Sequence, residues 1–367
     1  MCKKICFLFS FIVLFASFSP LVYSMDVSAK GIVLIEANSG EIIFEKNAFA
    51  PMPMASTTKI MTALVVIENC DLKKEALIPK EAVGIEGSSI YLNEGEKLTI
   101  EELLYALLLE SANDAAVALA YITAGGVDEF AILMNQKADE LGLKSTHFDN
   151  PHGLDSENHY TSAYDLAKIT AYAMKNPVFS QITSTYKKNI SLNNGAGTRV
   201  LINHNKLLRS YDGTIGVKTG FTRKSGRCFV SCAERDGVRL ICVSLNAPND
   251  WNDHKSLLDY GFTKYESVLL ANELDYLIEL NVQNGEASSF YATNLDSLKI
   301  TLPKGEKDIS AKIIYNRPLY APINEGELVG KIVFYNYENE IASLNLYATS
   351  TVNKINYKKS LFEGLFK

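Results

Sequence analysis

The chain changes several times in how hydrophobic and polar residues alternate, and each pattern predicts a different kind of element. Residues 31–47 hold two apolar runs on either side of Asn38-Ser39-Gly40, which is typical of a β-hairpin. From Ser56 onward apolar residues return every three or four positions, which predicts a helix. Thr99 and Glu102 have the spacing of a capping box, so a second helix should begin there and stop near Ser111.

Helical spacing continues through the middle of the chain and then gives way to strands. Amphipathic helices are predicted over residues 114–123, 127–142 and 163–175, with the polar loop HFDNPHGLDSENH between the last two. Strand patterns return near residue 213, and a hairpin should close on Asp236-Gly237. The order of strands, helices and strands predicts an α+β domain with helices against an antiparallel sheet.

The pattern of hydrophobic and polar residues changes after Tyr265. Short alternating runs such as LIELNVQ, LKITLP and KIVFYNY are separated by Gly and Pro, which predicts a small all-β domain. We expect a domain large enough to hold an active site over residues 25–265, the all-β domain over 266–350 and a separate tail over 351–367. No catalytic constellation is visible in the all-β part, so its expected role is positioning or binding.

The first 24 residues have the layout of a secretory signal peptide. Lys3 and Lys4 precede the apolar run Ile5–Phe18, and Val22-Tyr23-Ser24 provides small residues suited to cleavage. An uncleaved membrane anchor is the alternative, but the run is short against the roughly 20 residues of a full span. The segment therefore predicts export.

The tail is basic and amphipathic. The tail contains four lysines and one acid, Glu363, and the apolar residues between them can gather on one helical face. Such a tail suits an anionic membrane surface, although it could equally dock on its own protein. The four lysines are Lys354, Lys358, Lys359 and Lys367.

Composition narrows the function classes. Lys and Arg number 36 against 42 Asp and Glu, a net charge of -6, which argues against nucleic-acid binding. With 5 His and no HExxH, a zinc hydrolase is not indicated, and we expect neither a metal nor an organic cofactor. Past the signal segment the remaining cysteines are expected to be buried free thiols. They are Cys70, Cys228, Cys232 and Cys242.

A Ser-x-x-Lys pair occurs twice. Ser56 and Lys59 lie one helical turn apart, so they can meet on the same face. Ser184 and Lys187 precede a stretch that alternates like a strand, where they would point to opposite faces. The first pair is the candidate, because a serine hydroxyl needs an adjacent base and a buried lysine can be that base.

Two further elements support it. Ser111-Ala112-Asn113 falls in the break between two predicted helices, and Lys218-Thr219-Gly220 ends a predicted strand. A glycine at the end of such a strand lets a ligand approach the backbone. Ser-x-Asn recurs elsewhere in the chain, and a rival Lys224-Ser225-Gly226 lacks the preceding strand. Each motif alone is weak, so the signal is the ordered set SxxK, SxN and KTG, each at the expected element boundary.

These motifs resemble those of the penicillin-recognising serine enzymes. The stretches MASTTKIMTAL, ESANDAAVALA, NPHGLD and GVKTGFT are similar to those of D-alanyl-D-alanine carboxypeptidases, low-molecular-mass penicillin-binding proteins, above all to forms from spore-forming bacteria. The likeness covers residues 30–265 well and the rest less specifically. It implies a penicillin-binding-protein/β-lactamase-like domain, an antiparallel sheet with a helical subdomain, followed by the small all-β domain.

The resemblance also implies roles for residues. Ser56 would be the acylated nucleophile, Lys59 its base, Ser111 a proton relay to the leaving amine, and Asn113 a holder of the substrate peptide. Residues in and after the KTG motif would bind the terminal carboxylate of the substrate and the oxyanion that forms at the attacked carbonyl. The residues implied for that binding are Lys218, Thr219, Gly220, Phe221 and Thr222, with Asp155 of HGLD placed nearby.

The chain departs from many relatives at two positions. Phe221 stands where they carry His, which is tolerable if only its backbone is used. His204, in NHNKLL, stands where some carry Arg, so one electrostatic contribution is in doubt.

The function implied is removal of the terminal D-alanine from peptidoglycan stem peptides, with β-lactam antibiotics as covalent inhibitors. It would take place outside the cytoplasmic membrane, in the cell wall or periplasmic space. A DD-endopeptidase is the nearest alternative, and a β-lactamase would need a Glu-bearing loop that HFDNPHGLDSENH does not show. A wall-binding protein without catalysis is the alternative from another class.

Overall fold

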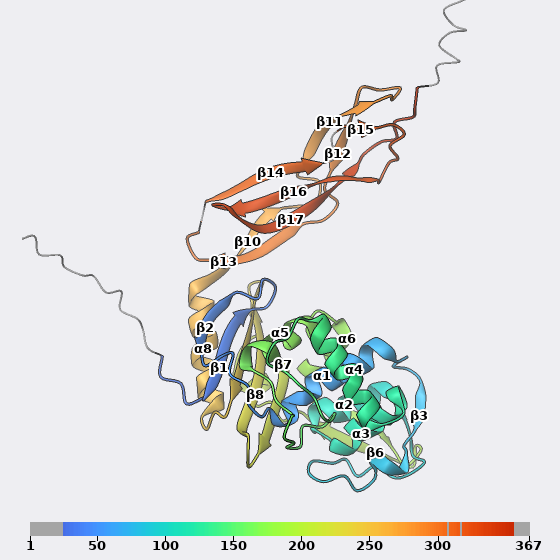
Figure 1. Ribbon diagram of the computed structural model, residues 1–367, viewed down its shortest axis with the longest axis vertical. Helices are drawn as coiled ribbons and strands as arrows, with labels where there is room; N and C mark the ends of the chain where they lie inside the picture. Colours follow the sequence, from blue (N-terminus) through green and yellow to red (C-terminus); the bar gives the residue numbers. More distant parts are fainter. Residues whose placement is uncertain (1–24, 307, 316–317, 356–367) are drawn as a thin grey trace, which may run out of the picture.

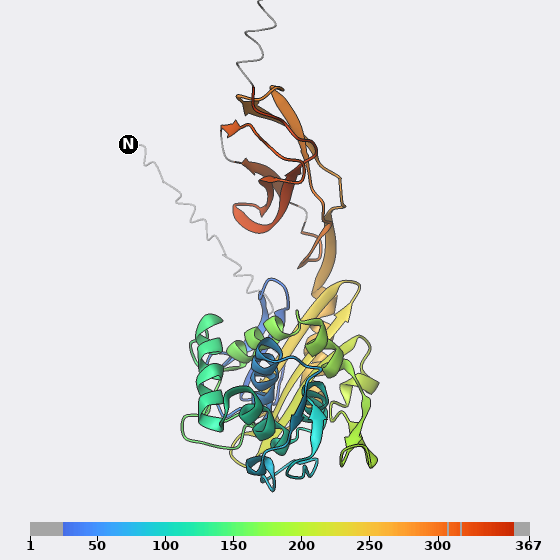
Figure 2. The same cartoon turned by 90° about the vertical axis from the view of Figure 1, so that its right-hand side faces the viewer.

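The computed structural model describes residues 25–306, 308–315 and 318–355. The predicted signal peptide and all but the first residues of the predicted tail lie outside the described residues. An α+β domain is followed by an all-β domain, and the two lie end to end in an elongated molecule (Figures 1 and 2). The predicted fold class is confirmed.

A five-stranded antiparallel sheet forms the centre of the first domain, in the order β2-β1-β9-β8-β7. The predicted hairpins are both present, and Asp236 and Gly237 take the positive φ angles of 50° and 80° that a tight hairpin turn needs. In the described sheet β7 pairs with β8 alone, so it is an edge strand. The strands are β1 Gly31–Glu36, β2 Ile42–Lys46, β7 Thr214–Thr222, β8 Gly226–Arg235 and β9 Val238–Leu245.

Helices cover both faces of this sheet. In β1, Val33 and Ile35 face the large core shared with the helical part, whereas Ile32 and Leu34 face the core under α8 (Asp250–Lys264). A strand buried on both faces has no polar side, which is why GIVLIE is an almost unbroken apolar run. The domain therefore has three layers, with the sheet in the middle.

The helical part agrees with the predicted spacing. Thr99 and Glu102 form the expected capping box, with the Glu102 N–H donating to Thr99 Oγ1 at 3.1 Å. The helix predicted from Ser56 begins as a 3₁₀ turn, η1 (Ala55–Thr58), before α1. The α-helices are α1 Lys59–Asn69, α2 Ile100–Leu109, α3 Asn113–Ala124, α4 Val127–Glu140, α5 Ala163–Ala173, α6 Pro177–Ser184 and α7 Leu207–Ser210, and η2 Lys80–Ala82 is a second 3₁₀ turn.

Two small hairpins were not predicted, and both pack beside the helical part. A buried ion pair links the second of them to the loop after η2, with Arg199 Nη1 2.6 Å from Glu96 Oε1. The hairpins are β3 Glu75–Leu77 with β4 Lys97–Thr99, and β5 Lys187–Leu192 with β6 Gly197–Ile202.

The second domain has no helix among its described residues. Its six-stranded sheet has the order β14-β16-β17-β12-β11-β15, and β10 and β13 form a separate pair next to the first domain (Figure 1). Its strands are β10 Tyr265–Ala271, β11 Leu277–Gln283, β12 Ser289–Thr293, β13 Leu298–Pro303, β14 Ile309–Tyr315, β15 Leu319–Tyr320, β16 Leu328–Asn336 and β17 Asn339–Ala348.

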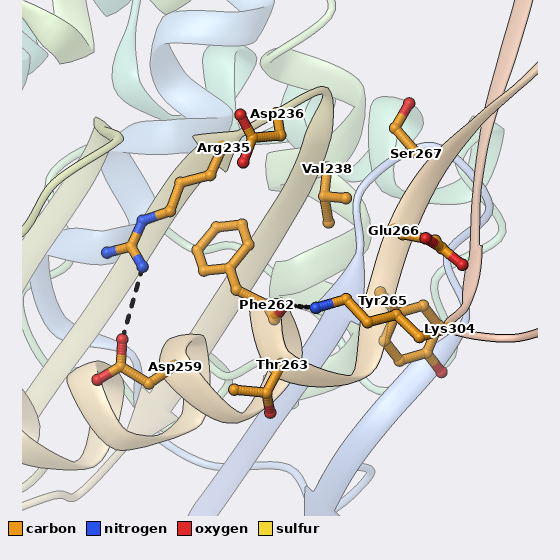
Figure 3. A pocket seen from close by; sticks show the side chains of 10 residues that line it. All are labelled: Arg235, Asp236, Val238, Asp259, Phe262, Thr263, Tyr265, Glu266, Ser267 and Lys304. Carbon is orange, nitrogen blue, oxygen red and sulfur yellow. Dashed lines mark hydrogen bonds and ion pairs between the residues drawn. The ribbon is translucent and has the colours of Figure 1, made fainter.

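The two domains meet at the end of α8. The Lys304 N–H donates to the Lys264 carbonyl at 2.8 Å, and Lys304 Nζ donates to the Phe262 carbonyl at 3.0 Å. These bonds satisfy two of the carbonyls that a helix end leaves open. Figure 3 shows this junction, where Arg235 and Asp259 form an ion pair at 3.7 Å and help to line a cavity of about 610 Å³.

The cysteines agree with the expectation of free thiols. All four described cysteines are unpaired; three are buried, and Cys70 is only half-buried. Among the described residues, no single helix is long and apolar enough to cross a membrane, although the bent pair α3 and α4 passes by length and composition.

Candidate active site

Ser56 and Lys59 meet at the start of α1. Ser56 lies in the η1 turn, which begins with Ala55 in the left-handed region at φ 47°, and Lys59 follows one turn later. Lys59 Nζ lies 3.0 Å from Ser56 Oγ. The predicted pair therefore forms. The rival pair does not, since Ser184 ends α6 and donates to the Gln181 carbonyl, while Lys187 is an exposed residue of β5.

The other contacts of Lys59 determine which way a proton can move. Its Nζ donates to Asn113 Oδ1 at 2.7 Å and to the His152 carbonyl at 2.6 Å, and both of these oxygens can only accept. A neutral amine has two N–H groups and one lone pair. With both N–H groups directed to these acceptors, the lone pair is left for the hydroxyl proton of Ser56.

The surroundings favour that neutral form. Lys59 is fully buried, and burial together with the charge of Lys218 holds its pKa well below the usual lysine value, against a smaller opposite effect of Asp114. A lysine that loses its proton near neutral pH can act as a general base.

Asn113 is fixed from both sides. Its Nδ2 donates to the Glu86 carbonyl at 2.6 Å, and its backbone N–H donates to the Ser88 carbonyl at 2.7 Å. This fixes the amide so that Oδ1 faces Lys59, and it leaves the second N–H of Nδ2 for another acceptor. Ser111, two residues earlier, lies in the break between α2 and α3 with φ 60°, an uncommon conformation for a residue with a side chain.

Strand β7 carries the third motif. Lys218 is buried with Nζ donating to the Thr219 carbonyl at 2.8 Å, and burial lowers the pKa of Lys218 to about 7, although the charge of Glu110 opposes this. A Cβ on Gly220 would come within 2.9 Å of the Ser56 backbone nitrogen. The absence of a side chain at Gly220 is therefore what lets the strand lie directly against the η1 turn that carries Ser56.

The polar loop 149–156 lies over the same turn. Besides the His152 carbonyl bound by Lys59, Gly153 lies so close to Ala55 that a Cβ there would overlap its carbonyl oxygen. Asp155 accepts from Thr222 Oγ1 at 3.0 Å, so this loop is tied to the end of β7. Asp155 thus reaches the site through Thr222.

One cavity of about 380 Å³ brings the motifs together. Ser56, Ser111, Thr219, Gly220 and Phe221 line it, while Lys59, Asn113 and Lys218 lie buried behind its wall. Of the predicted site residues, Asp155 alone neither lines this cavity nor lies next to or contacts a residue that does, and it is linked to the site through Thr222. Further lining residues are Ser88, His204, Lys206, Arg227, Asp250 and Trp251.

Sequence reasoning did not single out several of the groups that organise the site. The Glu86 and Ser88 carbonyls and the His152 carbonyl act through the backbone, which leaves no trace in residue type. Asp114 is different: it is buried and accepts from Ser89 Oγ at 2.6 Å and from the Leu92 N–H at 3.0 Å. An acidic residue among the apolar residues at the start of a predicted helix was a sequence signal for a buried, hydrogen-bonded carboxylate.

Among the described residues, no group of three or more His, Cys, Asp or Glu could hold a metal ion. The site instead combines a serine, a buried amine and a second buried cation.

Comparison with known proteins identifies the family. A family model described as D-alanyl-D-alanine carboxypeptidase matches residues 18–249, and a model of the penicillin-binding protein 5 C-terminal domain matches residues 265–354. The chain belongs to the D-alanyl-D-alanine carboxypeptidase family. It is a serine-type D-Ala-D-Ala carboxypeptidase, a peptidase of the hydrolase class, and the β-lactamase, endopeptidase and non-catalytic alternatives are not favoured.

Individual relatives agree with this assignment. D-alanyl-D-alanine carboxypeptidase DacF from Bacillus subtilis is 35% identical over 315 residues, covering 83% of this chain and 81% of its own. The DacA enzyme from Haemophilus influenzae is 32% identical, covering 99% and 96%. The resemblance to carboxypeptidases of spore-forming bacteria is thus confirmed.

A solved structure supports the same arrangement of two domains. Penicillin-binding protein 5 from Haemophilus influenzae matches with a TM-score of 0.72 and 30% identity, covering 91% of this chain and all of that one. The carboxypeptidase domain and the all-β domain therefore follow each other here as they do in a solved member of the family.

Proposed function

We propose that Ser56 is the acylated nucleophile of this carboxypeptidase and that Lys59 is its general base. The observation that carries the proposal is the 3.0 Å contact between Lys59 Nζ and Ser56 Oγ, made by an amine whose two other contacts are to oxygens that only accept. Burial supplies the lowered pKa that this role requires.

The reaction has two halves. Ser56 Oγ attacks the carbonyl carbon of the penultimate D-Ala while its proton moves to Lys59, and the C–N bond then breaks. The proton passes to the leaving amine through Ser111, which lines the same cavity, and D-Ala departs. Water then hydrolyses the ester on Ser56, again with Lys59 as the base.

The charges that develop have partners. The backbone N–H groups of Ser56 and Phe221 would bind the oxyanion, and Gly220 keeps strand β7 close enough to the nucleophile turn for both to act. Lys218 and Thr219, with Thr222 behind them, would bind the terminal carboxylate. The free N–H of Asn113 would bind the substrate's peptide carbonyl.

The substrate proposed is a peptidoglycan stem peptide ending in D-Ala-D-Ala, and β-lactams would acylate the same serine. The place of action proposed is the outer side of the cytoplasmic membrane or the cell wall. Membrane contact through the basic tail is part of this proposal, supported by its sequence pattern alone.

The test combines a pentapeptide substrate with a labelled penicillin. We expect the wild-type protein to release D-Ala and to retain the label, and Ser56→Ala to do neither. Ser184→Ala, which removes the serine of the second Ser-x-x-Lys pair, is the matched control and should behave as wild type. Label retained on Ser56→Ala would exclude Ser56 as the nucleophile.

A further inference from the structure

A second cavity of about 550 Å³ opens beside the catalytic one. It is lined by Tyr186, Asn203, His204, Asn205, Lys206 and Arg209, and it shares His204 and Lys206 with the catalytic cavity. The two cavities therefore adjoin at these residues. None of the motif residues lines the second one.

The shared boundary lies near the carboxylate-binding lysine. Glu110, whose charge acts on Lys218, also forms an ion pair with His204, with Nε2 3.2 Å from Oε2. His204 is thus in the electrostatic neighbourhood of Lys218. If Lys218 binds the carboxylate of the leaving residue, the second cavity adjoins the leaving side of the scissile bond.

The lining of the second cavity includes two cationic side chains that have no carboxylate partner in the described part of the protein. Within the described chain, neither Lys206 nor Arg209 forms an ion pair with a carboxylate; Arg209 instead donates to Tyr186 Oη at 3.0 Å and lies over that ring. Lys206 lies 6.0 Å from the Trp251 ring centroid. Although Glu110 contacts His204 at the boundary, neither cation is paired with it, and this positive excess in the lining favours an anionic ligand.

A buried asparagine forms part of the wall of the same cavity. Asn205 is almost fully buried, and its Oδ1 accepts from the Leu207 N–H at 3.0 Å, which fixes the orientation of the amide. Its Nδ2 has no partner among the described residues. Less than 1 Å² of this nitrogen is exposed, so the groups that a ligand in the open cavity meets are the two cations and not this donor.

We propose that this second cavity binds a further carboxylate on the leaving residue, so that the enzyme prefers leaving D-amino acids whose side chain ends in a carboxylate over uncharged ones of the same length. The inference rests on the proposed function, because it takes Lys218 as the site of the main-chain carboxylate. The chemistry is unchanged: the same amide bond breaks, and the amine leaves with the proton that came from Ser56.

The test uses three substrates with the same acyl part. Their leaving residues are D-Ala, D-α-aminopimelate and the ω-amide of D-α-aminopimelate, which differs from the acid only in charge. We expect wild-type kcat/KM to be about tenfold higher for the acid than for the amide, the scale of one charge-assisted hydrogen bond.

Variants separate binding from folding. Arg209→Gln should remove most of the preference for the acid and leave release of D-Ala unchanged, while Arg209→Lys should retain part of it. Asn205→Asp keeps the acceptor for Leu207 but replaces the donor by an anion, so it should favour the amide. Lys175→Gln removes an exposed cation at the end of α5 and is the charge-matched control.

Equal kcat/KM for acid and amide in the wild type would overturn the inference, as would an equal loss for both in Arg209→Gln. Failure of the proposed function would look different, because D-Ala release would then survive in Ser56→Ala.

Discussion

The charge of Lys218 lowers the pKa of Lys59, and both lysines are buried beside the same cavity. One cation therefore has two effects. It can attract a carboxylate, and it favours the neutral form of the neighbouring amine, which the proposed role of Lys59 as a base requires.

Replacement of Lys218 by Gln should separate these effects. Without that charge the pKa of Lys59 rises, so less of the amine is neutral at a given pH and the acidic limb of the acylation rate moves to higher pH. The measurement is the rate of acylation by a labelled penicillin between pH 5 and 9. Lys224→Gln, at an exposed position of the next turn, should leave the limb in place. An unmoved limb in Lys218→Gln would show that the coupling is absent.

The pH dependence above neutrality should report on Lys218 itself. Burial lowers its pKa to about 7, so the free enzyme loses this cation as the pH rises through that value. We expect kcat/KM for a D-Ala-D-Ala peptide to decline above about pH 7, whereas kcat should decline only at higher pH because a bound carboxylate raises the pKa of Lys218. Steady-state rates across pH test this, and coincident limbs for the two parameters would contradict it.

Gly220→Ala should abolish most activity without unfolding the protein. The added Cβ would lie 2.9 Å from the Ser56 nitrogen and 3.1 Å from the Thr57 nitrogen, and backbone atoms cannot swing aside as a flexible side chain can. Strand β7 would have to move away from the nucleophile turn. We expect a loss on the order of 100-fold in penicillin acylation, the scale of a removed oxyanion donor.

The control for this variant is Gly197→Ala. There the nearest atoms belong to the flexible side chain of Leu192, so both acylation and thermal stability should stay near wild type. Acylation of Gly220→Ala at the wild-type rate would mean that the close approach has no catalytic role.

The protein should lose stability as the medium becomes acidic. Burial lowers the pKa of His152 to about 3, of His159 to about 4 and of His254 to about 3, against about 6.5 in an unfolded chain. The unfolded state binds protons first, so this contribution to the free energy of unfolding is complete above about pH 6.5. It falls by roughly 1.4 kcal/mol per pH unit for each histidine as the pH drops toward the folded values.

Urea unfolding at pH 7 and pH 5 measures this decline. His254 bridges Ser231 and Ser244, so His254→Gln can keep both hydrogen bonds without titrating, and its pH slope should be shallower by about a third. Equal slopes for wild type and variant would exclude His254 as a contributor.

The sequence predicted the elements whose pattern is local. The Thr99 capping box, the Asp236-Gly237 turn and the helix faces depend on residues within a few positions of one another, and all were found. The pairing of β1 with β9 depends on contacts far along the chain, which local periodicity does not encode. The β5–β6 hairpin is local, and Asn193-Asn194-Gly195 between its strands is a turn signal from which it could have been predicted.

The same distinction applies to the site. Ser56 and Lys59 could be paired from their spacing alone, because one helical turn brings them together. The roles of the Glu86 and His152 carbonyls could not, since any residue supplies a carbonyl and only the fold brings these to Asn113 and Lys59. A boundary near residue 265 was predicted from the change in residue pattern, whereas the bonds of Lys304 to the end of α8 could not be predicted.

Strand β7 has β8 on one side and no strand on the other among the described residues. The backbone groups on its open side can therefore form hydrogen bonds with an extended peptide, which would add a strand to the edge of the sheet. Such pairing recognises the backbone of the bound peptide and depends less on its side chains. An unpaired edge of this kind would let the enzyme accept stem peptides of varied composition, because hydrogen bonds to the main chain do not depend on the side chains.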